Sequence, residues 1–245
     1  MQYAFSNIKN LLGKKLDLLV LNSCLVSNIE IVYEIKDYVD FIIASEKTTN
    51  GFRYNALSNL KTNPEITAYN IGKSIIDYTY QYYIDNNPSF HALTISLINT
   101  AAIDNTFIQT FNDYVSLFKV YTSFSPAATT NMLISNNNNC PYNYNPQIDL
   151  FALLQSSQNI SGYSAISTKA ATLYSYKDIL IPYLKKTNDL YSRDYRGISI
   201  FFNAYNVRFI SENYYLQKYI DSGSTFNYDM KWSDIGLRFC YPFSE

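Results

Sequence analysis

The feature that most constrains the fold is a short apolar run followed by a helical pattern and a second apolar run. Residues 16–21, LDLLVL, lie between Lys14-Lys15 and Asn22-Ser23 and are typical of a buried parallel strand. Residues 25–39 then place apolar side chains at helical spacing, and 41–45, FIIAS, form the second run. A strand, a helix and a strand of these lengths predict a βαβ unit with a right-handed crossover.

The same patterns extend the α/β interpretation along the chain. Apolar residues at helical spacing predict a helix over 4–12, which Gly13 can end. Asn50-Gly51 is a turn signal, and Pro64 can open a helix that runs to about residue 83. The remaining expected elements are strands over 90–98 and 197–203 and helices over 103–121, 148–155, 165–186 and 232–239.

Residues 125–147 carry the weakest pattern of the chain. They contain the run Asn136–Asn139 and three prolines, which is typical of a linker or a long surface loop. We therefore expect a first α/β part over 1–124 and a C-terminal portion over 148–245 that completes the same domain or packs on it.

The composition excludes several classes of protein. Hydrophobic residues make up 47% of the 245 residues, which is enough for a sizeable core. Because 19 Lys and Arg are offset by 20 Asp and Glu, no basic excess favours binding to nucleic acid. No apolar run is long enough to predict a membrane-spanning helix or a secretory signal. This pattern favours a cytoplasmic product, or a piece of a longer chain whose front end is missing.

Cysteine and histidine are sparse and widely spaced. An odd number of cysteines with no CxxC pair argues against a disulfide framework and against a zinc site, so the residues predict no cofactor. The one histidine, His91, precedes an expected strand and is interpreted as an ordinary half-buried or surface residue. The 25 tyrosines are interpreted as compositional bias, so we do not treat the cluster Tyr78, Tyr80, Tyr82 and Tyr83 as a site.

Cys24 stands out by its position between an expected strand and an expected helix. Ligands of open α/β sheets bind beyond the carboxyl ends of the strands. A thiol at a helix N-terminus also lies in the positive end of the helix dipole, which favours the thiolate that nucleophilic catalysis requires. The alternative is a small buried hydrophobic residue, as most free cysteines are.

The residues around Cys24 resemble the nucleophile segment of the clostripain family of cysteine endopeptidases. In that family a strand ends in Asp-Ala-Cys-Leu-Met, a helix follows with a Val-Glu and Tyr-Glu pattern, and the next strand ends in Ala-Ser-Glu. The matching positions here are 22–26 (NSCLV), Ile29-Glu30, Tyr33-Glu34, 44–46 (ASE), Gly51-Phe52, 93–97 (LTISL), 197–202 (GISIFF) and the patch around Trp232.

The resemblance implies a caspase–haemoglobinase-like α/β fold with a mainly parallel sheet flanked by helices and a C-terminal α+β portion. It implies hydrolysis of a peptide or protein substrate through an acyl-enzyme on Cys24, with a histidine as the base and backbone groups stabilising the oxyanion. Calcium is a possible ion by resemblance only, and family members are often secreted.

Two departures from the family pattern affect these implications. The family's histidine lies in a His-Gly motif before the cysteine strand, whereas no histidine precedes Cys24 here. We therefore expect a His-bearing N-terminal chain as a partner. The family's Asp, which helps to receive a Lys or Arg side chain, is replaced by Asn22, and this removes one negative charge from the pocket.

Four further residues are candidates for substrate binding. Asn22 and Ser23 directly precede Cys24, and Ser45 and Glu46 lie at the end of the second expected strand. Because strand ends face the site in such sheets, Glu46 can meet a basic substrate; the other interpretation is a solvated surface acid.

Three hypotheses remain open at this point. The chain is a clostripain-like peptidase part that needs its His-bearing partner, an inactive truncated homologue, or a non-catalytic binding module of the same fold. On the first, Cys24 is the catalytic residue. On the others, it is not.

Overall fold

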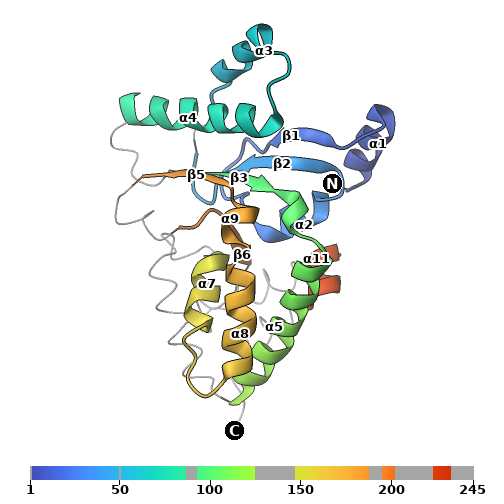
Figure 1. The fold of residues 1–245 in the computed structure, drawn as a ribbon, viewed down its shortest axis with the longest axis vertical. Coiled ribbons are helices and arrows are strands. Elements are labelled where there is room, and N and C mark those ends of the chain that lie inside the picture. Colours follow the sequence, from blue (N-terminus) through green and yellow to red (C-terminus); the bar gives the residue numbers. More distant parts are fainter. Residues whose placement is uncertain are drawn as a thin grey trace, which may run out of the picture. The chain divides into compact units, whose positions relative to one another are not determined.

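The computed structural model describes residues 2–49, 51–86, 93–124, 147–187, 195–201 and 223–232. These residues form two compact units, one of 1–102 with 177–198 and one of 103–176 with 199–245 (Figure 1). The chain thus leaves the first unit after residue 102 and returns to it at residue 177. The domain boundaries expected around 125–147 stay a prediction, because all but the last of those residues lie outside the described ranges.

The first unit is built on a four-stranded sheet in the order β1-β2-β3-β5. The strands are β1 (Leu16–Val20), β2 (Val39–Ala44), β3 (Thr94–Asn99) and β5 (Tyr183–Lys186). The parallel pairing of β1 with β2 around α2 (Ile29–Ile35) confirms the predicted βαβ unit. The β2–β3 and β3–β5 pairs are antiparallel, so the described sheet is mixed rather than mainly parallel. An apolar run looks the same in either chain direction, which is why the sequence did not show this.

The strand β1 lies at an edge of the described sheet. Within the described ranges it is paired only on its β2 side, and four of its five residues are half-buried. The expectation of a parallel strand is confirmed, whereas the expectation that it is buried is wrong. Four of the five residues of LDLLV are apolar, as in a central strand, but side-chain patterns do not report whether the backbone edge is paired.

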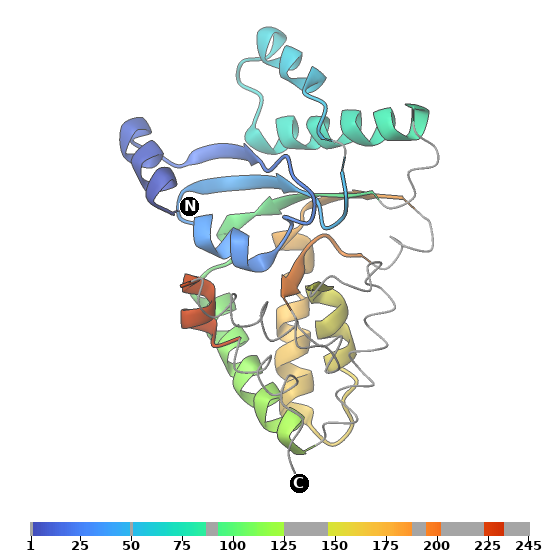
Figure 2. The same ribbon diagram turned by 180° about the vertical axis from the view of Figure 1, so that it is seen from behind.

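Helices cover both faces of this sheet. Figures 1 and 2 show α4 (Ala68–Asn86) on one face and α2 with α9 (Lys177–Leu180) on the other. The apolar residues of α4 recur at helical spacing and pack in one cluster with β2 and β3. Gly72 permits this close approach, because a Cβ there would lie 2.7 Å from Leu97 Cδ1. The cluster comprises Ile43, Phe52, Ala56, Ile71, Ile75, Ile76, Tyr83, Leu93, Ile95 and Leu97.

Several predicted boundaries of the first unit can be compared directly. The helix α1 (Gln2–Leu12) ends before Gly13, whose φ of +69° confirms the predicted stop. The helix expected from Pro64 begins later, at Ala68, after a short segment of η1 (Asn55–Ser58) and α3 (Asn59–Thr62) and a turn. The helix expected over 25–39 is shorter, since α2 covers only Ile29–Ile35.

The second unit combines helices with a two-stranded antiparallel sheet. Its strands are β4 (Gln147–Asp149) and β6 (Ser199–Phe201), and its helices are α5 (Asn105–Phe124), α7 (Leu150–Ser157), α8 (Ser164–Tyr174) and α11 (Thr225–Met230). Aromatic rings from α5 and α11 fill its core together with Trp232, whose Nε1 donates to Phe201 O at 2.5 Å. The predicted helix over 103–121 is confirmed by α5.

Other predictions for the later half are changed or lie outside the described ranges. The expected helix over 165–186 divides into α8, α9 and β5, and the expected helix over 148–155 begins only at Leu150, after β4. Most of the loop over 125–147, and residues 233–239 of the expected terminal helix, are not described. None of the described helices is long and apolar enough to cross a membrane.

Candidate active site

The candidate site lies where the chain turns after β1. Leu21 N still donates to Ile43 O at 2.9 Å, and the chain then bends through Asn22, Ser23 and Cys24, all three of which are exposed. The exposure of Cys24 shows that the interpretation as a small buried hydrophobic residue is wrong. Its thiol stands just beyond the carboxyl end of a strand, on an exposed residue.

The backbone directly after the thiol is strained. Leu25 has a φ of +61°, in the left-handed region that a leucine seldom adopts. This conformation redirects the chain toward the loop after β2, where Leu25 N donates to Lys47 O at 3.2 Å and Ser27 N donates to Ser45 O at 3.0 Å. The turn therefore fixes Cys24 against the residues that follow β2.

The thiol of Cys24 is held by the backbone of Thr49. Thr49 N donates to Cys24 Sγ at 3.3 Å, and Sγ donates to Thr49 O at 3.4 Å. A backbone N–H directed at sulfur stabilises the thiolate, because hydrogen bonds to a charged acceptor are stronger than those to a neutral one. The Thr49 N–H is thus the directed hydrogen-bond donor to the sulfur, in place of the helix N-terminus that the sequence predicted.

The helix itself does not reach Cys24, so that assignment is wrong. The helix α2 begins at Ile29, and Asn28 caps it by accepting hydrogen bonds from Glu30 N at 3.0 Å and Ile31 N at 3.2 Å. The four residues between Cys24 and Ile29 form the bend and the helix cap. The apolar periodicity continues through this bend, which is why the sequence overestimated the helix.

Asn22 and Ser23 share the exposed rim with Cys24. Asn22 Oδ1 accepts a hydrogen bond from Phe52 N at 3.3 Å, and Ser23 N donates to Leu21 O at 2.9 Å. Asn22 also lies against Gly51, where an added Cβ would be 3.3 Å from Asn22 Oδ1. The two residues therefore lie beside the candidate nucleophile, and their role in substrate binding stays a prediction.

Ser45 and Glu46 lie on the buried side of the same loop. Ser45 Oγ donates to Lys47 O at 3.0 Å and accepts from Lys47 N at 3.2 Å. Glu46 is only 3% exposed, and its Oε2 accepts from Gly197 N at 2.8 Å. The interpretation of Glu46 as a solvated surface acid is therefore wrong. Its part in a substrate pocket, like that of Ser45, stays a prediction.

Gly197 links three segments beneath the site. Its carbonyl oxygen accepts from Ser27 Oγ at 2.5 Å and from Ser96 Oγ at 2.6 Å, while its N–H donates to Glu46. Its φ of +105° is available to glycine and disfavoured for other residues. Sequence reasoning found Gly197 by resemblance but not this role, which depends on contacts between residues far apart in the chain.

Thr49 and Tyr83 also escaped sequence reasoning. The turn signal Asn50-Gly51 marked this loop, but it gave no indication that Thr49 would meet the thiol. Tyr83 was set aside within a tyrosine cluster, yet its hydroxyl donates to Gly51 O at 3.2 Å.

Among the described residues, no three His, Cys, Asp or Glu side chains are grouped so that they could hold a metal ion. His91, Cys140 and Cys240 lie outside the described ranges.

The fold and the exposed strand-end thiol define the class of a caspase-like α/β protein with a candidate cysteine nucleophile. The chain matches the model of the clostripain family over residues 2–237, and it therefore belongs to the clostripain family. The predicted resemblance and the caspase-like α/β fold are thereby confirmed, and the family makes the chain a C11-type cysteine peptidase by family and fold.

Solved structures of similar proteins support the fold. A clostripain from Bacteroides thetaiotaomicron in complex with a peptide inhibitor is 15% identical, with a TM-score of 0.62 over 94% of this chain and 93% of that chain. A cysteine protease of B. fragilis is 15% identical, with a TM-score of 0.60 over 98% and 94%. An inactive zymogen C11 protease from Parabacteroides distasonis is 16% identical, with a TM-score of 0.59 over 92% of this chain and 62% of that chain. A comparison with curated proteins finds no match.

Proposed function

We propose that this chain carries the nucleophile of a clostripain-type cysteine endopeptidase and works together with a His-bearing segment outside the 245 residues. The observation that carries the proposal is the exposed Cys24 thiol, which receives the N–H of Thr49 at the carboxyl end of β1. An accessible sulfur with a fixed hydrogen-bond donor has the first two properties that a thiol nucleophile needs. The third is a base, which the partner segment supplies.

The reaction proceeds through a thioester on Cys24. The histidine takes the thiol proton, and the sulfur adds to the scissile carbonyl carbon to form a C–S bond. The C–N bond then breaks as the leaving amine accepts that proton from the histidine. Water, deprotonated by the histidine, attacks the thioester, the C–S bond breaks, and the sulfur recovers a proton as the carboxylic product leaves.

The edge of β1 is the place where the partner segment would pair. A strand with one unpaired edge offers a row of N–H and C=O groups to an added strand. A groove of about 680 Å³ is lined by residues of β1, including Leu18 and Val20, and by apolar residues such as Leu57, Leu60 and Ile66. Leu57 and Leu60 are each 43% exposed, so an added segment would bury apolar surface as well as pair its backbone.

Co-expression tests this proposal. The chain is produced with and without the segment encoded immediately upstream of Met1, and hydrolysis of a fluorogenic peptide is measured. We expect hydrolysis only from the combination, and none from the combination that carries Cys24→Ala. Because Cys24 is exposed and its thiol makes only two weak hydrogen bonds to the Thr49 backbone, its replacement should lower the free energy of unfolding by no more than about 1 kcal/mol, so lost activity would not reflect lost folding.

Two outcomes would count against the proposal. A folded combination without hydrolysis would favour the alternative of an inactive homologue or a non-catalytic binding module of the same fold. Hydrolysis that persists after Cys24→Ala would mean that the nucleophile is another residue.

The expected substrate preference follows from the charges of the residues next to Cys24. Asn22 is neutral, and Glu46 is buried with its carboxylate bound to Gly197 N, so among the described residues the exposed rim of Asn22 and Ser23 carries no negative charge to favour a basic side chain before the scissile bond. We expect the combination to cleave after Lys or Arg with little preference over neutral residues, and Asn22→Asp to raise that preference. Ser23→Ala, at the neighbouring exposed position, is the matched control and should leave it unchanged.

A further inference from the structure

The loop that holds the Cys24 thiol is itself anchored to α4 by two side chains. Tyr83 OH donates to Gly51 O at 3.2 Å, and Thr79 Oγ1 accepts from Arg53 N at 2.9 Å. Both side chains are buried, and they lie one helical turn apart on α4. The loop after β2 is therefore fixed by hydrogen bonds to α4, a helix that contains no predicted site residue.

Tyr83 reaches the thiol through a short series of contacts. Its hydroxyl lies 3.5 Å from Thr49 Oγ1, which in turn accepts from Gly51 N at 3.3 Å. The phenol, the Thr49 side chain and the Gly51 backbone thus form a closed network. The backbone of the same Thr49 makes both hydrogen bonds to Cys24 Sγ.

The two bonds from Thr49 to sulfur are unequal in their effect. A thiol is a weak donor to the Thr49 carbonyl, whereas the Thr49 N–H forms a charge-assisted bond once the sulfur is ionised. A held Thr49 therefore keeps one N–H directed at the sulfur during its reaction, while its carbonyl oxygen orients the S–H of the resting thiol. If the loop moves away, the thiolate loses a directed donor and exchanges it for water.

From these contacts we propose that Tyr83 is a positioning residue, which holds Thr49 against Cys24 and thereby raises the reactivity of the thiol. The inference rests on the proposed role of Cys24 as the nucleophile. It gives Tyr83 a function beyond filling the core, since the ring packs in the apolar cluster while the hydroxyl donates to Gly51 O. Removing the hydroxyl separates these two contributions.

Alkylation of Cys24 by iodoacetamide tests the inference without any peptidase activity. The rate for the peptide that contains Cys24 is followed by mass spectrometry in the native chain and in Tyr83→Phe. At pH 7 we expect roughly a threefold or larger fall in rate, the size that corresponds to weakening one hydrogen bond to the reacting group.

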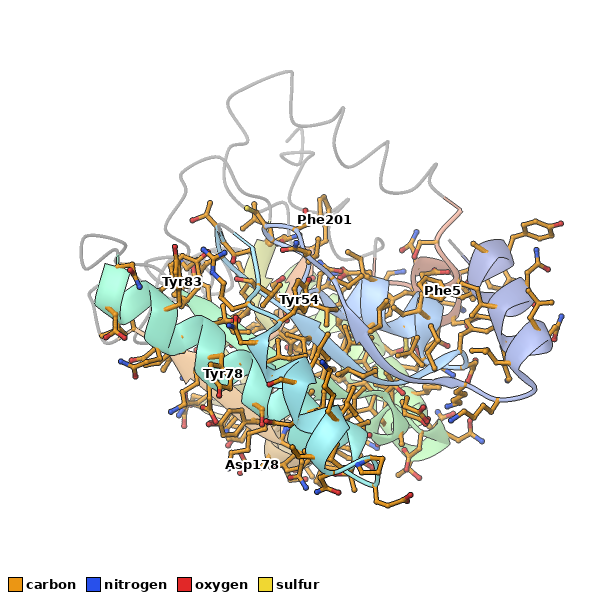
Figure 3. The ribbon with its side chains drawn as sticks, turned by 90° about the horizontal axis from the view of Figure 1, so that it is seen from above. Phe5, Tyr54, Tyr78, Tyr83, Asp178 and Phe201 are labelled. Atoms are coloured by element: carbon orange, nitrogen blue, oxygen red, sulfur yellow. The ribbon has the colours of Figure 1, made fainter. Side chains whose placement is uncertain are left out.

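Accessibility alone predicts the opposite result. Cys24 is already exposed, so a looser loop would add little access, and any effect of access would raise the rate rather than lower it. The matched control is Tyr78→Phe on the same helix, where the side chain is 49% exposed (Figure 3). It should alkylate at the native rate. A Tyr83→Phe rate equal to the control, or above it, would overturn the inference.

Thr49 provides a second, independent variant. Thr49→Val removes the hydroxyl that faces Tyr83, whereas Thr49→Ser keeps it. We expect the Val variant to slow alkylation, the Ser variant to restore it, and the Tyr83→Phe, Thr49→Val pair to be no slower than the slower single variant. Independent, additive effects would show that Tyr83 does not act through Thr49. A chain that alkylates as expected but fails the co-expression test would leave this inference standing while contradicting the proposed peptidase.

Discussion

The carboxylate of Glu46 accepts a hydrogen bond from the backbone N–H of Gly197 at 2.8 Å, across 151 positions of the chain. This contact joins the loop that follows β2 to the segment that follows β5. The same loop carries Thr49, whose backbone binds the Cys24 thiol. A buried carboxylate is costly unless it is well hydrogen-bonded, so the position of Glu46 is set by the fold as much as by any substrate.

Replacing Glu46 with alanine should therefore reduce stability. Glu46→Ala leaves the Gly197 N–H buried without its acceptor, and we expect the free energy of unfolding to fall by about 2 kcal/mol. Glu46→Gln retains an acceptor oxygen and should cost less. Urea denaturation measures both. Glu65→Ala, at an exposed acid of the same unit, should stay within about 0.5 kcal/mol of the native chain. Equal effects at the two sites would contradict this account.

Gly197 should tolerate no side chain. Its φ of +105° disfavours an L residue, and an added Cβ would lie 2.7 Å from Ser96 Oγ and 2.9 Å from Ile181 Cγ2. We expect Gly197→Ala to lower the free energy of unfolding by roughly 3 kcal/mol, which combines backbone strain with overpacking. Gly13→Ala is the control for strain alone, because its φ is +69° but nothing lies within 4 Å. Gly13→Ala should lower the free energy of unfolding by about 1 kcal/mol. An equally small loss for Gly197→Ala would mean that Ser96 and Ile181 move aside without cost.

The cap of α2 should contribute measurably to the turn that carries Cys24. Asn28→Ala removes the acceptor for Glu30 N and Ile31 N, and we expect a loss of about 1 kcal/mol in the free energy of unfolding. Asn28→Asp should retain most of it, since a carboxylate also caps a helix. Asn10→Ala, at an exposed position inside α1, should be neutral or slightly stabilising because alanine favours helices. A loss at Asn10 equal to that at Asn28 would argue against the cap.

Local patterns predicted the parts of the fold that depend on local physics. The βαβ unit follows from two apolar runs on either side of a helical period, and the end of α1 follows from Gly13. Strand direction and edge position do not leave such a pattern. The antiparallel pairing of β3 and the edge position of β1 in the described sheet depend on which segments meet in space.

The candidate site divides in the same way. Cys24 could be found because a strand end and a resemblance both indicate it. The N–H that faces its sulfur comes from Thr49, 25 positions away, and the anchor of that loop comes from Tyr83, a further 34 positions along. Neither residue type is unusual in a chain with 25 tyrosines, so only the folded arrangement distinguishes Tyr83 from its neighbours.

The second unit gives a prediction that depends on pH. Tyr114 is fully buried, its hydroxyl lies 2.8 Å from Ser157 Oγ, and burial raises the pKa of this phenol above its ordinary value of 10.0. Above about pH 10 the unfolded chain releases the Tyr114 proton while the folded chain retains it, so stability falls as the pH rises. Tyr114→Phe should cost about 1 kcal/mol at pH 7 through the lost hydrogen bond, yet reduce the downward slope above pH 10 by up to about 1.4 kcal/mol per pH unit. Tyr228→Phe, 84% exposed in the same unit, should match the native chain at pH 7. The free energy of unfolding is measured by denaturation at each pH from 7 to about 11. If it falls with pH equally in Tyr114→Phe and in the native chain, the slope does not come from Tyr114.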